Sequence, residues 1–392
     1  MGFMWKVKNK IVFLRNGFYQ NKESGSKDKN ALRFTHVTYC AVGNAGDTML
    51  SQCVRREYLA QENVSAWNIL QVTDAVTSRT IEEINNTAAI VIGGGGLFIG
   101  DTNKNNISGW QWPISKEQLE DIRCPIFIFS VGFNFFRGQP VSEIFKDNLE
   151  ALIRKAAFVG LRNHGSVEAV RALLPDELKC KVVYQPCITT LISGLYHEKH
   201  MTYGKKVAYN VAFDRLEQRF GKNKDRVLKQ IAKSAKEISD KGYEVYYVAH
   251  MKDDFQFISY LDNEKISYAI VDLTNALPFK IIDFYKKVDI ILGMRGHAQM
   301  IPFGMNCGII TLGSHDKMKW FLEDIDQTNL YIELQNETDT ISQRIVDCFE
   351  ENYEGGNFEK TIENLKKAQL KLQTITENNF VTIHEVLEAR HD

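Results

Sequence analysis

The sequence lacks the features that would place this protein in a membrane or nucleic-acid-coating class. No run of about 18 apolar residues occurs in the 392 residues, so no membrane-spanning helix is predicted. Lysine and arginine (48) are balanced by aspartate and glutamate (49), and a net charge of −1 argues against general binding to nucleic acid. Residues 1–11 contain lysines without a long apolar segment after them, so we do not expect a signal peptide.

Cysteine and metal motifs are missing as well. The seven cysteines are scattered, odd in number and without a CxxC pair, which fits reduced thiols in a cytoplasm better than disulfides or a zinc site. No HExxH motif occurs, which disfavours a metal site. We therefore expect no metal, no cofactor and a cytoplasmic protein. The sequence leaves open whether the protein also lies against the inner face of the membrane.

Predicted strands alternate with predicted helices along most of the chain, after a short strand predicted at residues 11–14. The hydrophobic fraction of 44% is enough for a sizeable core. The alternation indicates an α/β fold with two doubly wound parallel-sheet domains that face a cleft. We place the domains at residues 1–197 and 205–350, with a C-terminal helix at 351–392 that packs back on the body.

Two glycine-rich turns follow predicted strands in the first domain. Gly43–Thr48, with the sequence GNAGDT, precedes a predicted helix at Met49–Ala60, and helix amide groups after a glycine turn favour anions. The alternative is a tight turn with Asp47 as the N-cap or as an acid in the first turn of the helix. Gly93–Gly96 follow a strand predicted at Ala89–Ile92. Because a turn needs only one or two glycines, four suggest close passage of a ligand, with crowding by a neighbouring helix as the alternative.

Arginine and histidine residues follow other predicted strands. Arg162, and the pair Arg295 and His297, come directly after apolar runs, and ligands of parallel sheets sit past the carboxyl ends of strands. Arginine can bind a carboxylate or phosphate in a bidentate fork, and histidine suits proton transfer near neutral pH. His315 and Lys317 follow the next strand and could face the same anion. The alternatives are ion pairs for the arginines and a hydrogen-bonded core histidine.

Together these motifs resemble the polysaccharide pyruvyltransferase family. The resemblance covers roughly residues 38–325, and its elements are NAGD (44–47), IGGGG (92–96), VGLR with a following serine (159–166) and MRGHA to SHDK (294–317). It implies a GT-B-like pair of domains. It also implies transfer of the enolpyruvyl unit of phosphoenolpyruvate onto a sugar as a ketal, with release of phosphate. Gly296 stands where the family usually has leucine or phenylalanine, and Asn163 where it usually has an acid.

The resemblance also implies roles on the donor side of the reaction. Arg162 and Arg295 would bind the anionic donor, and His297 would give or take protons. Lys317 or His315 would hold the phosphate. The resemblance thus implies that phosphoenolpyruvate itself is a partner, as the donor substrate rather than as a cofactor.

On the acceptor side, the resemblance implies a sugar site in the first domain. Asn44, Asp47, Gly94 and Gly95 would contact the sugar, and Asp47 is a second candidate for the base. The sequence leaves open whether the sugar is lipid-linked, and no nucleic acid is expected as a partner. Two other functions stay open: a GT-B glycosyltransferase that uses a nucleotide sugar, and a glycan- or anion-binding relative without turnover.

Overall fold

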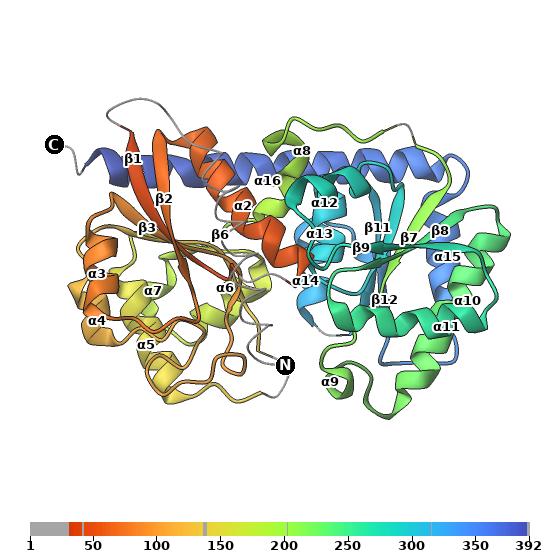
Figure 1. Cartoon of the computed structure of the whole chain (residues 1–392), viewed down its shortest axis with the longest axis horizontal. Helices are drawn as coiled ribbons and strands as arrows, with labels where there is room; N and C mark the ends of the chain where they lie inside the picture. The colour runs from red at the N-terminus through yellow and green to blue at the C-terminus, as the bar shows by residue number, and fades with distance from the viewer. Residues whose placement is uncertain (1–30, 41–42, 136–138, 202, 315, 390–392) are drawn as a thin grey trace. The chain divides into compact units, whose positions relative to one another are not determined.

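The computed structural model describes residues 31–40, 43–135, 139–201, 203–314 and 316–389 (Figure 1). The strand predicted at residues 11–14 lies outside this part of the chain. Contacts divide the chain into two units. Unit 1 comprises residues 1–42, 47–188 and 373–392, and unit 2 comprises residues 43–46 and 189–372.

Unit 1 holds a six-stranded parallel sheet within the described residues. The strand order is β2-β1-β3-β4-β5-β6. Its strands are β1 (Leu32–Thr38), β2 (Val64–Gln71), β3 (Ala89–Phe98), β4 (Ile126–Phe133), β5 (Phe158–Leu161) and β6 (Val182–Tyr184). Its helices are α2 (Ala45–Gln61), α3 (Ser78–Asn85), α4 (Lys116–Asp121), α5 (Glu143–Lys155), α6 (His164–Arg171) and α7 (Asp176–Lys179). The 3-10 helix η1 (Ile188–Leu191) starts at the end of this segment and lies mostly in unit 2.

Unit 2 holds a second six-stranded parallel sheet in its described part. The order is β12-β11-β10-β7-β8-β9. Its strands are β7 (Lys206–Asn210), β8 (Glu244–Ala249), β9 (Tyr268–Asp272), β10 (Ile290–Gly293), β11 (Gly308–Gly313) and β12 (Tyr331–Glu333). Its helices are α8 (Ile192–Leu195), α9 (Leu216–Phe220), η2 (Gly221–Asn223), α10 (Lys224–Asp240), η3 (Lys252–Phe257), α11 (Ile258–Asn263), α12 (Pro278–Tyr285), α13 (His297–Gly304), α14 (Asp316–Asp324), η4 (Thr328–Leu330), α15 (Ile341–Tyr353) and part of α16 (Asn357–Glu388).

Both sheets are buried on their two faces, as parallel sheets usually are. All eight residues of β4 and all six residues of β11 are buried. In unit 2, α10 and α15 pack side by side over the sheet (Figure 1). The predicted α/β class, with two doubly wound parallel sheets and C-terminal helices, is confirmed.

Each sheet has one point where the order of its strands reverses direction. In unit 1 this point lies between β1 and β3, because the chain adds β2 on one side of β1 and β3 on the other. In unit 2 it lies between β7 and β10. Loops on the two sides of such a point diverge, and ligands bind in the crevice just outside the carboxyl ends of the strands there.

The four glycines of unit 1 lie inside a strand, so the prediction that β3 ends at Ile92 is wrong. β3 continues through the glycines to Phe98. Glycine is favoured there because neighbouring groups lie close to the backbone of the strand. A Cβ at Gly94 would lie 2.9 Å from Leu50 Cγ in α2, and one at Gly93 would lie 2.7 Å from the carbonyl oxygen of Phe129 in β4. Crowding by the neighbouring helix and strand, the alternative explanation, accounts for these two positions.

The long helix α16 contributes residues to both units. In the half that belongs to unit 2, Gln369 Nε2 donates to the carbonyl oxygens of Thr190 (2.7 Å) and Gly304 (3.1 Å). In the half that belongs to unit 1, Asn379 Nδ2 donates to the Tyr184 carbonyl oxygen at 2.9 Å. Neither this helix nor any other in the described part of the chain is long and apolar enough to span a membrane.

Candidate functional site

Arg295 lies at the carboxyl edge of unit 2, where two aspartates surround its guanidinium group. Asp254 Oδ2 accepts a hydrogen bond from Arg295 Nε at 2.9 Å, and Asp254 Oδ1 accepts one from Nη2. Asp214 Oδ1 lies 2.7 Å from Arg295 Nη1. The side chain of Arg295 is 10% exposed and that of Asp254 is fully buried. The ion pair named as the alternative for Arg295 is therefore present.

Asp254 is the anchor of this cluster. Its Oδ2 also accepts hydrogen bonds from the backbone N–H groups of His250 (3.1 Å) and Met251 (3.0 Å), and from Asn210 Nδ2 (3.4 Å). One carboxylate thus ties the end of β7, the loop after β8 and Arg295 together. A buried carboxylate without such donors would be costly, so these hydrogen bonds fix Asp254 in place.

Arg219, in α9, is a second guanidinium that the sequence did not reveal. Its Nη2 lies 3.0 Å from Asp214 Oδ2, and its Nη1 donates to Ser314 Oγ at 3.0 Å. Asp214 therefore bridges Arg219 and Arg295 with one oxygen each. Burial alone would raise the pKa of Asp214, but the two guanidinium groups hold that pKa well below its usual range. No sequence motif marks Arg219; only the strand order brings its loop beside Arg295.

His297 is the first residue of α13 and lies half-buried beside the GNAGDT turn. Residues 43–46 group with unit 2, and the Ala45 N–H donates to the His250 carbonyl oxygen at 3.1 Å. Asn44 Oδ1 accepts from the Gly46 N–H at 2.9 Å and so closes the turn. The Cα of Gly46 faces the imidazole of His297 so closely that a Cβ there would collide with it. The glycine of this motif is therefore needed to seat the turn against His297.

Replacing Gly46 with alanine should lower the free energy of unfolding by about 1–3 kcal/mol, because the new methyl group overpacks the contact with His297. Thermal and urea unfolding would measure the change. Gly296→Ala is the matched control, since a Cβ at Gly296 would meet nothing within 4 Å. Equal losses in the two variants would show that the close approach of Gly46 is unimportant.

His250 is a buried neutral histidine next to the cluster. Its Nε2 lies 2.6 Å from the Tyr285 hydroxyl, and its Nδ1 has no hydrogen-bond partner among the described residues. Burial lowers the pKa of His250 from 6.5 to about 4, and the attraction of Asp254 offsets only part of this effect. The imidazole is thus uncharged at neutral pH.

Stability should fall as the pH drops from 6.5 to about 4, because the unfolded chain binds a proton at His250 before the folded protein does. The shift corresponds to roughly 3 kcal/mol for this group. Urea unfolding across this pH range would measure the slope. His250→Gln should flatten it, and parallel curves for the variant and the parent would contradict the prediction.

In unit 1, Arg162 and Asp47 lie at the carboxyl edge of the sheet. Arg162 follows β5 and is 9% exposed, and its Nη2 donates to Asn134 Oδ1 at 2.8 Å. Its Nε–H has no hydrogen-bond partner among the described residues. Burial lowers the pKa of Arg162, and the nearby Cys187 and Asp47 offset part of that effect. Asp47 lies half-buried in the first turn of α2.

The two departures from the family pattern, Asn163 and Gly296, are both compatible with the local structure. Asn163 caps α6, since its Oδ1 accepts from the Ser166 N–H at 2.7 Å. Asparagine and aspartate cap helices about equally well, so the substitution preserves the local structure. Gly296 has an ordinary helical φ of −52° and open space around it, so a larger residue would also fit there.

The remaining predicted residues lie as follows. Lys317 is half-buried in the first turn of α14, after β11. His315 lies outside the described residues. Gly94 and Gly95 are buried in β3, with φ values of 70° and 124° that favour glycine. The structure thus groups Asn44, Arg295, His297 and Lys317 in unit 2, and Asp47, Arg162, Gly94 and Gly95 in unit 1.

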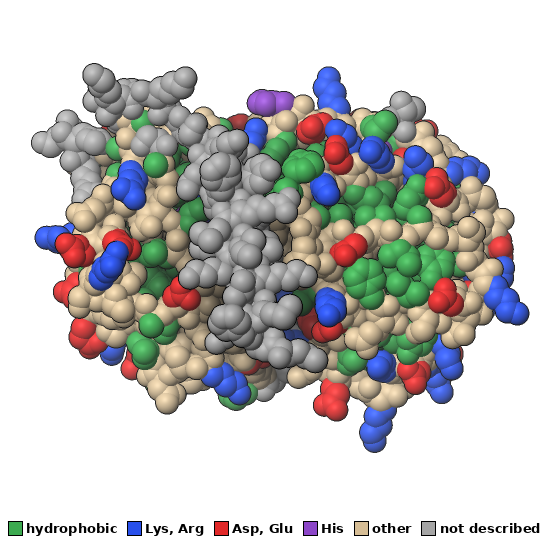
Figure 2. Space-filling view, viewed as in Figure 1, with side chains coloured by type: hydrophobic (Ala, Val, Ile, Leu, Met, Phe, Trp, Pro, Cys, Tyr) green, Lys and Arg blue, Asp and Glu red, His purple; other side chains and the backbone are tan. Residues whose placement is uncertain are grey.

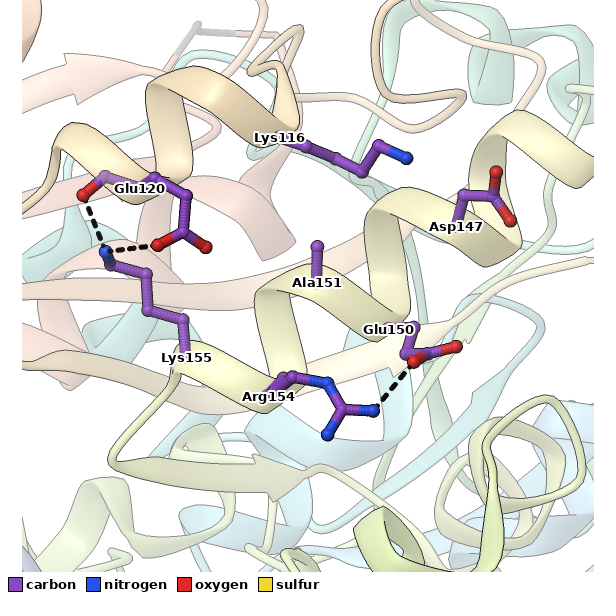
Figure 3. Close-up of a pocket in the computed structure, with 7 residues that line it drawn as sticks. All are labelled: Lys116, Glu120, Asp147, Glu150, Ala151, Arg154 and Lys155. Atoms are coloured by element: carbon purple, nitrogen blue, oxygen red, sulfur yellow. Dashed lines mark hydrogen bonds and ion pairs between the residues drawn. The ribbon is translucent and has the colours of Figure 1, made fainter.

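A surface hollow between α4 and α5 of unit 1 has no part in this arrangement (Figure 3). Arg154 is paired there with Glu150 at 2.8 Å, and Lys155 with Glu120 at 3.8 Å. Two of its cations, Arg154 and Lys155, are thus paired with acids. No group of three or more metal-ligating side chains occurs among the described residues.

Solved structures of low sequence identity share the fold of this chain, whereas no curated protein matches it. A UDP-GlcNAc 2-epimerase from Neisseria meningitidis bound to UDP-GlcNAc has a TM-score of 0.54 at 12% identity, covering 91% of this chain and 99% of that one. A glycosyltransferase from Rickettsia africae ESF-5 has a TM-score of 0.52 at 11% identity, with the same coverage of 91% and 99%. A putative UDP-N-acetylglucosamine 2-epimerase from Listeria monocytogenes has a TM-score of 0.53 at 10% identity, covering 89% and 97%.

These similarities confirm the GT-B-like fold and, at such low identity, the fold alone. The family is shown by a different comparison. The family model described as polysaccharide pyruvyl transferase matches residues 9–316, and the chain therefore belongs to this family of transferases.

Proposed function

We propose that the protein transfers the enolpyruvyl group of phosphoenolpyruvate onto a sugar of a bacterial surface glycan or its precursor, forming a pyruvate ketal. The family supports a pyruvyl transfer. The observation that carries the proposal is the position of Arg295 and His297, which follow β10 at the point where the strand order of unit 2 reverses. A guanidinium and an imidazole there can bind an anion and move a proton.

The donor carries a carboxylate and a phosphate, with about three negative charges near neutral pH. Arg295 donates from Nε and Nη2 to Asp254, and its Nη1 lies 2.7 Å from Asp214 Oδ1. We propose that N–H groups of its guanidinium not used by Asp254 bind the donor anion. Lys317 in α14 and the N-terminus of α13 add positive potential at the same edge.

His297 would act as the acid and base of the reaction. Proton donation to C3 of the enol makes C2 electrophilic, and a sugar hydroxyl then attacks C2 and gives up its proton. The C2–O bond to phosphate breaks, phosphate leaves, and a second hydroxyl closes the ketal with loss of its proton. One imidazole can donate the first proton and accept one of the two that the hydroxyls lose, while the other leaves with the phosphate or to solvent. The reaction involves no net change of oxidation level, so no oxidant or reductant is needed.

For the acceptor we propose a site in unit 1 around Asp47, at the start of α2 after β1. Asp47 could accept the proton of a sugar hydroxyl. Arg162, for which the resemblance implies donor binding, has a buried Nε–H with no partner among the described residues that an anionic group could accept from. Gly94 packs against Leu50 of α2, and its contact with the sugar stays a prediction. Seven scattered cysteines without a CxxC pair are consistent with the cytoplasmic location that we propose.

Charged side chains of both signs are interspersed over the face drawn in Figure 2, apart from its grey residues. The positive charge that we assign to donor binding comes from single side chains at one sheet edge, Arg295 and Lys317. A small polyanion is a better match to such a site than an extended one.

The test is phosphate release from phosphoenolpyruvate, measured over a panel of glycan acceptors. We expect release that depends on both the donor and one class of acceptor. Thermal unfolding with phosphoenolpyruvate, UDP-sugars and GDP-sugars separates the rival functions: stabilisation by a nucleotide sugar alone would indicate a glycosyltransferase. Stabilisation by phosphoenolpyruvate without release over the whole panel would indicate a binding protein without turnover.

A further inference from the structure

The two carboxylates of this cluster in unit 2 pair differently with its two arginines. Arg295 is already matched by the fully buried Asp254, with which it forms two parallel hydrogen bonds. Asp214 is the only carboxylate paired with Arg219 among the described residues. Two guanidinium groups and two carboxylates together carry no net charge. Without the Asp214 carboxylate, the same cluster would carry one positive charge in a nearly buried position.

The two carboxylates differ in how firmly they are held. Asp254 has no exposed surface and accepts two backbone N–H groups besides its arginine. The side chain of Asp214 is 30% exposed, and its partners are the two arginines. It lies in the loop after β7, directly before Arg215, which has a left-handed φ of 54° at the start of α9. Asp214 can therefore leave toward solvent, whereas Asp254 cannot.

Both arginines have contacts other than the carboxylate of Asp214 that would hold them in its absence. Arg219 Nε donates to the backbone carbonyl oxygen of Asp214 at 2.8 Å, and Nη1 donates to Ser314 Oγ. Arg295 is held by Asp254. The site is thus preformed: each guanidinium group offers one nitrogen to one oxygen of a carboxylate. A carboxylate or phosphate of a ligand can supply the same two oxygens.

We propose that Arg219 and Arg295 form an exchangeable anion site, in which the carboxylate of Asp214 is the resident occupant and is displaced by a carboxylate or phosphate group of the substrate. The inference rests on the proposed function for the identity of that substrate. In this proposal Arg219 binds the substrate, and the carboxylate of Asp214 is an internal competitor of the substrate anion for the two arginines. This competitor keeps the buried arginines paired when no substrate is present and weakens the binding of anions.

Titration calorimetry with inorganic phosphate, pyruvate and phosphoenolpyruvate tests the proposal on the full chain. Asp214→Asn keeps the shape of the side chain and removes its charge, so it should bind phosphate, pyruvate or both at least about tenfold more tightly than the parent. Asp339→Asn is the matched control, because Asp339 pairs with Arg226 at 3.2 Å on the exposed surface. The control should leave all three affinities unchanged.

Thermal unfolding gives a second readout that a merely structural Asp214 would not produce. Asp214→Asn should be less stable than the parent in buffer without anions, and phosphate should raise its melting temperature more than that of the parent. A gain with phosphate but not with pyruvate assigns the site to the phosphate group, and the reverse assigns it to the carboxylate. If Asp214→Asn binds both anions as weakly as the parent or more weakly, the proposal is wrong.

A variant on the other partner covers the case in which Asp214→Asn does not fold. Arg219→Lys keeps the charge but loses the fork, and it should weaken binding of the same anion by at least about tenfold. Unchanged binding by this variant overturns the proposal. Failure of the proposed function would be seen separately. If Asp214→Asn binds phosphate more tightly but the parent releases no phosphate from phosphoenolpyruvate, the anion site is supported and the proposed reaction is wrong.

Discussion

Replacing His297 with alanine should slow ketal formation by about 10²–10⁴-fold, because the reaction would lose its general acid and base. The affinity for phosphoenolpyruvate should change little, since the arginines that bind the donor are held by Asp254 and Ser314 rather than by His297. Phosphate release and donor binding, measured on the same preparation, separate the two effects.

His384→Ala provides the control for this experiment. His384 lies on the surface part of α16 in unit 1 and pairs with Glu62 at 3.2 Å. Its loss should leave the rate unchanged. If His297→Ala released phosphate at a near-normal rate with donor and acceptor present, His297 would not be the acid and base.

Replacing Asp254 with alanine should destabilise the protein by about 3–5 kcal/mol, the largest stability effect that we expect. Its loss would leave the guanidinium of Arg295 without its bidentate partner and would strand the N–H groups of His250 and Met251. The side chain has no exposed surface, so water cannot easily replace these contacts. Urea unfolding at neutral pH measures the loss.

The neighbouring acid supplies a close control. Asp253 lies in the same 3-10 helix, η3, and is exposed. Asp253→Ala should stay within about 0.5 kcal/mol of the parent, as exposed substitutions usually do. Similar losses at the two positions would mean that Asp254 does not anchor the cluster.

The sequence predicts the strands best where an apolar run ends in polar residues. β5, β6 and β8 have the predicted bounds Phe158–Leu161, Val182–Tyr184 and Glu244–Ala249. The prediction for β3 is too short because glycine is typical of turns. Inside the folded unit, contact with α2 and β4 favours glycine at Gly93 and Gly94, and the strand continues through them. Tertiary packing overrides the local preference there.

Only part of the candidate site can be predicted from the sequence. Arg295 and His297 can be placed at a strand end, because the residues just before them form an apolar run. Their partners cannot be found in this way. Asp254 lies 41 residues from Arg295 in sequence, and Arg219 reaches the site only because β7 lies beside β10 in the sheet. Strand order is decided by packing of the whole unit, so a pattern within one segment does not contain it.

The glycine turn shows the same limit. The pattern GNAGDT predicts a turn that approaches a ligand, and Gly46 does permit a close approach, but to the imidazole of His297. Both residues belong to motifs of the family resemblance, and nothing in the sequence shows that they touch. The side chain of Asn44 closes this turn, because its Oδ1 accepts from the Gly46 N–H, and its contact with a sugar stays a prediction.

Binding of the anionic donor at the carboxyl edge of unit 2, where the strand order reverses between β7 and β10, is the central claim. Amide hydrogen exchange with and without phosphoenolpyruvate tests it most directly. We predict slower exchange in residues 211–219 and 293–314, with little change at the opposite end of the same sheet around Tyr203 and Phe358. Protection confined to that opposite end, or to unit 1 alone, would contradict the claim.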